Sequence, residues 1–102
     1  MVNLEDALKY LGIDDTDEMI NTNVSRALSS ARLTLKGAVG DDIDVYLPDD
    51  PRADELTLKY MADLYDNRGL GGKAANADHA MTNTLETQLR MELRRARRED
   101  SR

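Results

Sequence analysis

Arginines gathered near the C-terminus are the side chains whose type and spacing could do chemistry. The cluster comprises Arg90, Arg94, Arg95, Arg97 and Arg98. Most of them recur at three- and four-residue spacing, which places them along one side of a helix. Guanidinium forks bind carboxylates and phosphates in bidentate fashion, so the cluster favours docking onto an acidic surface or contact with nucleic acid. The alternative is a solvated helix end, where positive charge lies at the negative end of the helix dipole.

An acidic body is the counterpart of this basic end. The net charge is -6, with 15 acidic and 7 basic residues in positions 1–68 against 5 acidic and 7 basic in positions 69–102. The aspartates of the predicted central loop are Asp41, Asp42, Asp44, Asp49 and Asp50. Copies arranged head to tail are expected to attract one another through these two surfaces. Tight DNA binding is disfavoured, because phosphate neutralisation dominates that affinity.

Other candidate sites fail on detail. The glycine-rich run at residues 69–73 ends in Lys73, but Ala74 stands where a phosphate-binding loop needs Ser or Thr, and a helix is predicted before it. A hinge is the better interpretation. His79 is the only histidine and there is no Cys, while the carboxylate runs lack the spacing of a calcium loop. No nucleophile is paired with a base, so we expect no enzyme, no metal and no cofactor.

Hydrophobic periodicity predicts the helices that position these groups. Asn3 begins a short helix that Gly12 ends. Asp15 and Glu18 have capping-box spacing and open a long second helix, from about residue 16 to about 37. Its apolar stripe consists of Ile20, Val24, Ala27, Leu28, Ala31, Leu35 and Ala38.

The second half of the chain is expected to hold two more helices. Residues 40–50 form a loop with a brief extended segment at 45–47, and Asp50 before Pro51 starts the third helix. The buried face of this helix is Leu56, Tyr60, Met61, Leu64 and Tyr65. After a flexible connection at 69–77, a last helix carries Met81, Leu85, Leu89 and Leu93 four residues apart. The prediction is a small all-α four-helix domain with a long second helix. Residues 1–74 form its core, and residues 75–102 form an arginine-rich helix that can project.

The end of the third helix and its surroundings resemble a known family. Tyr60, Leu64, Tyr65, Asn67 and Arg68 lie in a segment similar to the Tyr-Glu-Asn-Arg-Glu helix end of head–tail connector proteins of tailed bacteriophages. Residues 4–15 resemble the family's opening helix, and the long second helix and the proline- and aspartate-containing loop follow in the family's order. The match spans about residues 3–70. Gly69 stands where the family usually has a glutamate, and the arginine-rich end has no counterpart.

The resemblance implies a non-enzymatic structural protein of the virion, made in the host cytoplasm. Such proteins form a ring of about a dozen copies below the portal, extend the DNA channel and receive tail or head-completion proteins. DNA would pass through an acidic channel without specific binding. Two alternatives stay open: a small oligomeric regulator that binds nucleic acid through the arginine-rich helix, and an antitoxin-like or chaperone-like partner protein. No apolar run approaches the roughly 20 residues of a membrane span.

Overall fold

The computed structural model describes residues 2–15, 17–66 and 75–101, and only the main chain at residues 66 and 75–80. Its helices are α1 (Leu4–Leu11), α2 (Glu18–Val39), α3 (Ile43–Tyr46), α4 (Pro51–Asp66) and α5 (Ala75–Asp100). These residues contain no strand, so the all-α prediction is confirmed for them. None of the described helices is apolar over a length that would cross a membrane.

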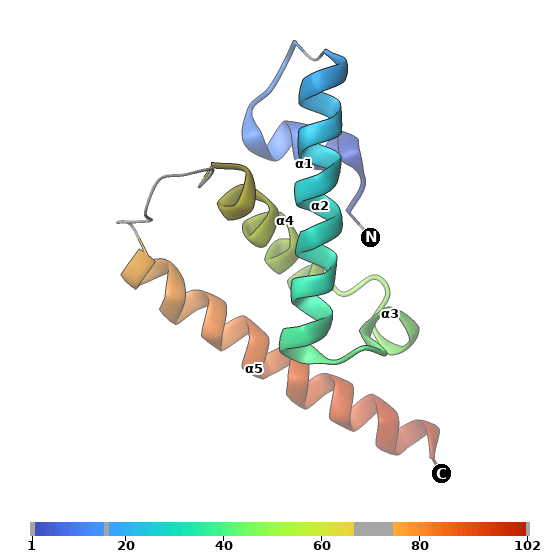
Figure 1. Ribbon diagram of the computed structural model, residues 1–102. Coiled ribbons are helices and arrows are strands. Elements are labelled where there is room, and N and C mark those ends of the chain that lie inside the picture. Colours follow the sequence, from blue (N-terminus) through green and yellow to red (C-terminus); the bar gives the residue numbers. More distant parts are fainter. Residues whose placement is uncertain (1, 16, 67–74, 102) are drawn as a thin grey trace.

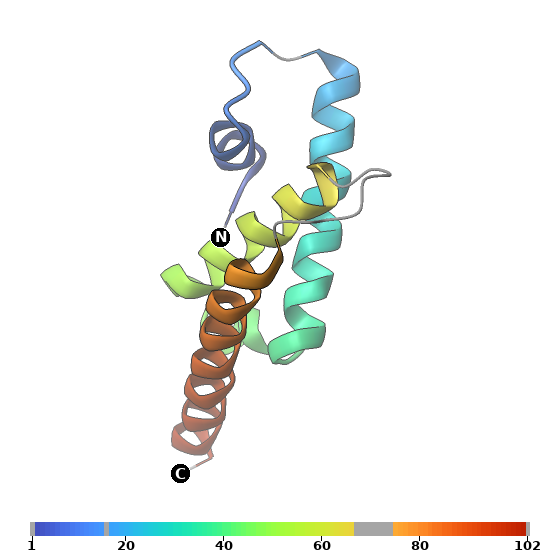
Figure 2. The same ribbon diagram turned by 90° about the vertical axis from the view of Figure 1, so that its left-hand side faces the viewer.

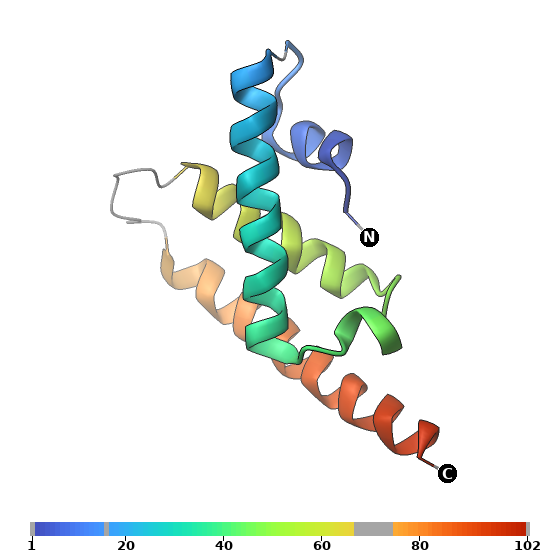
Figure 3. The ribbon, with the colours of Figure 1, turned by 45° about the vertical axis from the view of Figure 1, so that its right-hand side comes forward.

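The long helix α2 organises the domain. It packs most extensively against α4, with α1 beside its first half and α5 crossing below its last half (Figure 1). In Figure 2, α2 lies at the right of the molecule, with α1 and α5 to its left and α4 crossing toward it. Figure 3 shows the outward side of α2 with no other helix in front of it. The C-terminal end of α5 extends past the other helices.

Local capping explains where the first two helices begin and end. The Asn3 side chain accepts a hydrogen bond of 2.8 Å from the Asp6 amide, and the Asp6 carboxylate accepts one from the Asn3 amide, which is a complete capping box. Gly12 ends α1 with a φ of 73°, a left-handed conformation that glycine adopts without strain. The predicted cap at Asp15 is wrong, because Asp17 accepts the 2.8 Å bond from the Ile20 amide.

The segment between α2 and α4 differs from the prediction. Residues 43–46 form the short helix α3 in place of an extended segment, and Ile43 is only 1% exposed. The short turn lets Ile43 reach the apolar space between α2 and α5, which an extended segment would leave unfilled. The start of α4 is as predicted: the Asp50 carboxylate accepts a 2.9 Å bond from the Arg52 amide, one residue inside Pro51.

Two apolar clusters hold the helices together. The first core consists of Val2, Ala7, Val24, Ala27, Leu28, Ala31 and Met61. The second core consists of Leu35, Ile43, Ala53, Leu56, Leu89 and Leu93. Tyr60 lies between them and packs against both. The prediction that Leu64 is buried is wrong: it is 45% exposed, although it shares a side of α4 with Leu56 and Met61, because it lies in the last turn of the helix, beyond the part that the cores cover.

Candidate functional site: the docked arginine-rich helix

Helix α5 is docked on the body of the protein through its leucine stripe. Leu89 and Leu93 are fully buried in the second core, and Leu85 packs against its edge. The main chain at Gly40 lies so close to α5 that a Cβ atom there would be 2.6 Å from Leu93 Cδ2 and 2.8 Å from Arg97 Nη2. A glycine at the end of α2 therefore permits the close approach of α5.

An ion pair fastens the last turns of α5 to the turn that follows α2. The Arg97 guanidinium donates two hydrogen bonds to the Asp42 carboxylate, the Nε bond being 2.6 Å. Hydrogen bonding to Arg97 holds the pKa of Asp42 below its ordinary value of 3.8 and raises the pKa of Arg97. Nearby, the Tyr46 hydroxyl donates a 3.0 Å bond to Asp100, and this bond raises the pKa of Tyr46. These contacts join Tyr46 to Asp100, 54 positions apart in the chain, and Asp42 to Arg97, 55 positions apart.

Two further contacts tie the middle of α5 to α4 and α2. The Tyr60 hydroxyl donates a hydrogen bond to the Glu86 carboxylate, and burial together with this bond raises the pKa of Tyr60. Arg90 donates a 3.1 Å bond to the Ala38 carbonyl at the end of α2. A cation at this place also offsets the partial negative charge of the last carbonyls of α2. Arg90 thus takes part in the intramolecular docking of α5.

Several charged residues predicted to attract a second copy have partners within the chain. Asp42 is paired with Arg97, as described, and Asp44 with Lys36 at 3.3 Å. Arg95 lies 3.3 Å from Glu99 and 3.9 Å from Glu92 on the same helix. The Asp50 carboxylate is paired with Arg52 at 2.9 Å, which lowers the pKa of Asp50. Part of the charge that was predicted to attract a second copy is therefore paired within one chain.

Two arginines of the cluster remain exposed on the outward side of α5. Among the described residues, Arg94 and Arg98 have no hydrogen bond or ion pair, and Asp41 has none either. Met91, one turn before Arg94, is 64% exposed. Arg90 and Arg97 thus take part in docking, Arg95 pairs along its own helix, and Arg94 and Arg98 have no partner among the described residues.

The tyrosine-containing end of α4 is described only in part. Tyr65 is partly buried and packs with Tyr60 against the first core, in agreement with the predicted stripe. Asn67, Arg68 and the glycine-rich run with Lys73 lie outside the described residues, as does the side chain of His79. The predictions for those residues therefore stay predictions.

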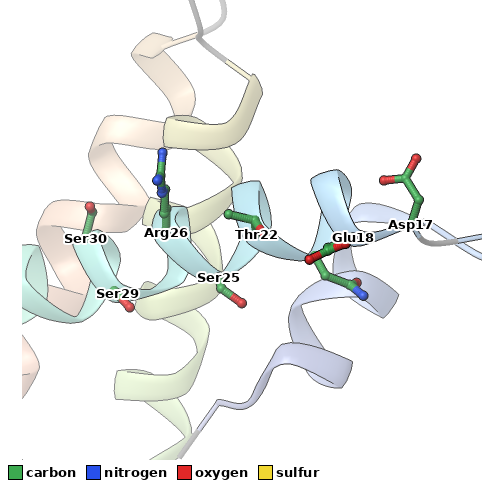
Figure 4. A pocket seen from close by; sticks show the side chains of 8 residues that line it. Asp17, Glu18, Thr22, Ser25, Arg26, Ser29 and Ser30 are labelled. Atoms are coloured by element: carbon green, nitrogen blue, oxygen red, sulfur yellow. The ribbon is translucent and has the colours of Figure 1, made fainter.

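Sequence reasoning missed a groove on the outward side of α2. It runs between two rows of side chains four residues apart (Figure 4). The rows are Asp17, Asn21, Ser25 and Ser29 on one side and Glu18, Thr22, Arg26 and Ser30 on the other. The side chains in the second half of the groove are small, apart from Arg26, so the groove stays open. Rows of this spacing are the ridges between which a neighbouring helix packs. The signal available in the sequence was the run of serines opposite the apolar stripe.

Comparisons with known proteins give no relative: no family model, no curated protein and no solved structure matches this chain. Within the described residues, no three His, Cys, Asp or Glu side chains gather as a metal site would require.

Proposed function

We propose that this protein is a structural subunit of a tailed-phage virion, which forms a ring between the portal and the tail and extends the DNA channel. The observation that carries the proposal is the order of features over residues 3–68. A capped opening helix, a long second helix and a proline- and aspartate-containing turn are followed by α4, which carries Tyr65 and ends at Asp66. Asn67 and Arg68 come next in the sequence, and this order is that of the connector family.

Charge supports the same proposal. A chain of net charge -6 repels the phosphate backbone, so DNA can slide past a ring of such subunits without being held. Arg97 and Arg90 take part in intramolecular contacts, which reduces the positive charge that is free to bind phosphates.

The alternative function is a small regulator that binds nucleic acid. The observation in its favour is that Arg94 and Arg98 are exposed without a partner among the described residues. Two free cations and a neighbouring Arg95 supply few phosphate contacts. We therefore expect only weak, non-specific binding, with Kd of roughly 10⁻⁴ to 10⁻⁶ M at physiological salt.

One pair of measurements separates the two functions. The mass of the purified protein is measured alone and with the portal protein encoded in the same genome, and duplex binding is measured in parallel at physiological salt. The proposal predicts a stable complex with assembled portal that survives added salt. A complex with one preferred duplex at about 10⁻⁸ M, without portal binding, would establish the regulator instead.

A further inference from the structure

The outward sides of α2 and α5 are complementary to each other. On α2, Met19 is 73% exposed and borders the groove, which continues past Arg26 to Ser29 and Ser30. On α5, Met91 is 64% exposed on the side that carries Arg94 and Arg98. Each side therefore presents a large apolar side chain to solvent, and on α2 a run of small residues lies beyond it.

The two exposed methionines, Met91 and Met19, indicate where the helices would meet. With Met91 beside Met19 and the helices antiparallel, Arg94 and Arg98 lie toward Asp15 and Asp14, because both helices rise about 1.5 Å per residue. In the parallel arrangement the same two arginines would lie toward Thr22 and Arg26. The contact between the methionines alone does not choose the direction.

Charge chooses the antiparallel direction. The start of α2 is acidic, with Asp14, Asp15 and Asp17 exposed and the first two without an ion pair in the described part of the chain. Beyond Met91, the outward side of α5 carries the unpaired Arg94 and Arg98. Only the antiparallel arrangement brings these opposite charges together. The parallel arrangement would instead bring Arg98 beside Arg26, a pair of like charges.

The two surfaces cannot meet within one chain. Helix α2 lies in front of α5 in Figure 3, and the buried leucines of α5 are turned toward the body of the protein, so the outward sides of the two helices face away from each other. We infer that the outward side of α2 in one copy binds the outward side of α5 in the next copy, with Met91 beside Met19 and Arg94 and Arg98 against the acidic start of α2. Such a contact joins unlike surfaces, so it repeats around a ring or along a filament. The inferred contact rests on the proposed function, because that function requires the copies to associate into a closed ring.

Charge reversal tests this contact. In the basic-to-acidic variant, Arg94→Glu and Arg98→Glu are combined; in the acidic-to-basic variant, Asp14→Lys and Asp15→Lys are combined. Each variant alone places like charges together in every contact, so its self-association is expected to be weakened roughly ten-fold or more at low salt. In an equimolar mixture, each contact between unlike variants has opposite charges again. Sedimentation velocity should therefore show association regained in the mixture.

Controls separate this contact from a general effect of charge. Lys9→Glu on α1 and Glu55→Lys on α4 reverse exposed charges away from both surfaces and should associate as the wild type does. Met91→Glu should weaken association, whereas Val45→Glu, at a 74% exposed residue of α3, should not. Circular dichroism of every variant checks that helicity and melting temperature are retained.

Three results would overturn the inference. The first is a wild-type protein that stays monomeric at roughly 10 µM to 1 mM at low salt. The second is charge-reversal variants that associate as the wild type does. The third is an equimolar mixture of the two variants that fails to regain association. Portal binding is measured separately on the same samples. Portal binding without rescue in the mixture would reject this contact and leave the proposed function. Rescue in the mixture without portal binding would reject that function and leave the contact.

Discussion

The first and second cores are both apolar, but they differ in side-chain size and in the distance along the chain that they span. The first core is rich in alanine and joins α1 to the adjacent α2, with Met61 added from α4. The second core contains four buried leucines and Ile43, and it joins α2, α3 and α4 to α5. A bidentate ion pair between Asp42 and Arg97 lies beside the second core.

This difference shows which contacts hold the arginine-rich helix α5 in place. Helix α1 is held by local caps and small contacts, whereas α5 is held by large side chains at one point and by polar contacts on both sides of it. Burying a leucine contributes about 1.5–3 kcal/mol, whereas the attraction between Asp42 and Arg97 is screened by solvent and contributes less. The leucines therefore hold α5, and the ion pair sets the direction of its last turns.

Truncation of a large side chain in the second core should give the largest effect. Leu93→Ala leaves a cavity between α2 and α5 and is expected to lower the free energy of unfolding by about 2–5 kcal/mol. The matched change in the first core, Val24→Ala, removes fewer carbons and should cost less, at about 2 kcal/mol. Urea denaturation of both variants measures the difference. Equal losses would show that the two cores contribute alike.

A methyl group at the close contact of α2 and α5 should have an intermediate effect. Gly40→Ala would place a Cβ against Leu93 and Arg97, with an expected loss of about 1–3 kcal/mol. Gly37→Ala is the control, since Gly37 lies inside α2 with open space around it and should gain about 0.5–1 kcal/mol. The melting temperature should thus fall for Gly40→Ala and rise for Gly37→Ala, although the two glycines are only three residues apart. A shift in the same direction would contradict the close approach of α5.

The ion pair beside the second core should give the smallest effect, visible as a pH dependence. Hydrogen bonding to Arg97 lowers the pKa of Asp42 in the folded protein below its ordinary 3.8. The stabilisation is therefore complete above that value and is lost as the pH falls through the lower, folded-state pKa. Asp42→Asn should lower the melting temperature at neutral pH and reduce its fall on acidification below pH 3.8. Asp41→Asn removes the same charge at the neighbouring residue, and its melting temperature should fall on acidification as that of the wild type does.

Much of the helical framework followed from the sequence. The stripe of α2 was found at the correct residues: Val24, Ala27, Leu28, Ala31 and Leu35 are all buried. The end of α1 at Gly12 and the start of α4 after Asp50 were also predicted. Such features depend on spacing and on capping between neighbours in the chain, so the sequence contains them directly.

The candidate site was less predictable, because it depends on contacts between distant residues. The arginines were recognised as a cluster, but their division into Arg97 paired with Asp42 and the unpaired Arg94 and Arg98 required the position of α5. Helix α3 was missed because its four residues form few internal hydrogen bonds and gain their stability from the burial of Ile43.

The sequence by itself determined that this protein is helical, where its longest helices run and that its charge is divided between an acidic body and a basic end. Tertiary structure decided how far along each helix the apolar side is covered, and hence that Leu64 is exposed and Leu93 is buried. It also decided that Asp42 meets Arg97 across 55 positions of the chain. The physical reason is that periodicity and capping act within a few residues, whereas the partner of a side chain depends on how whole helices pack.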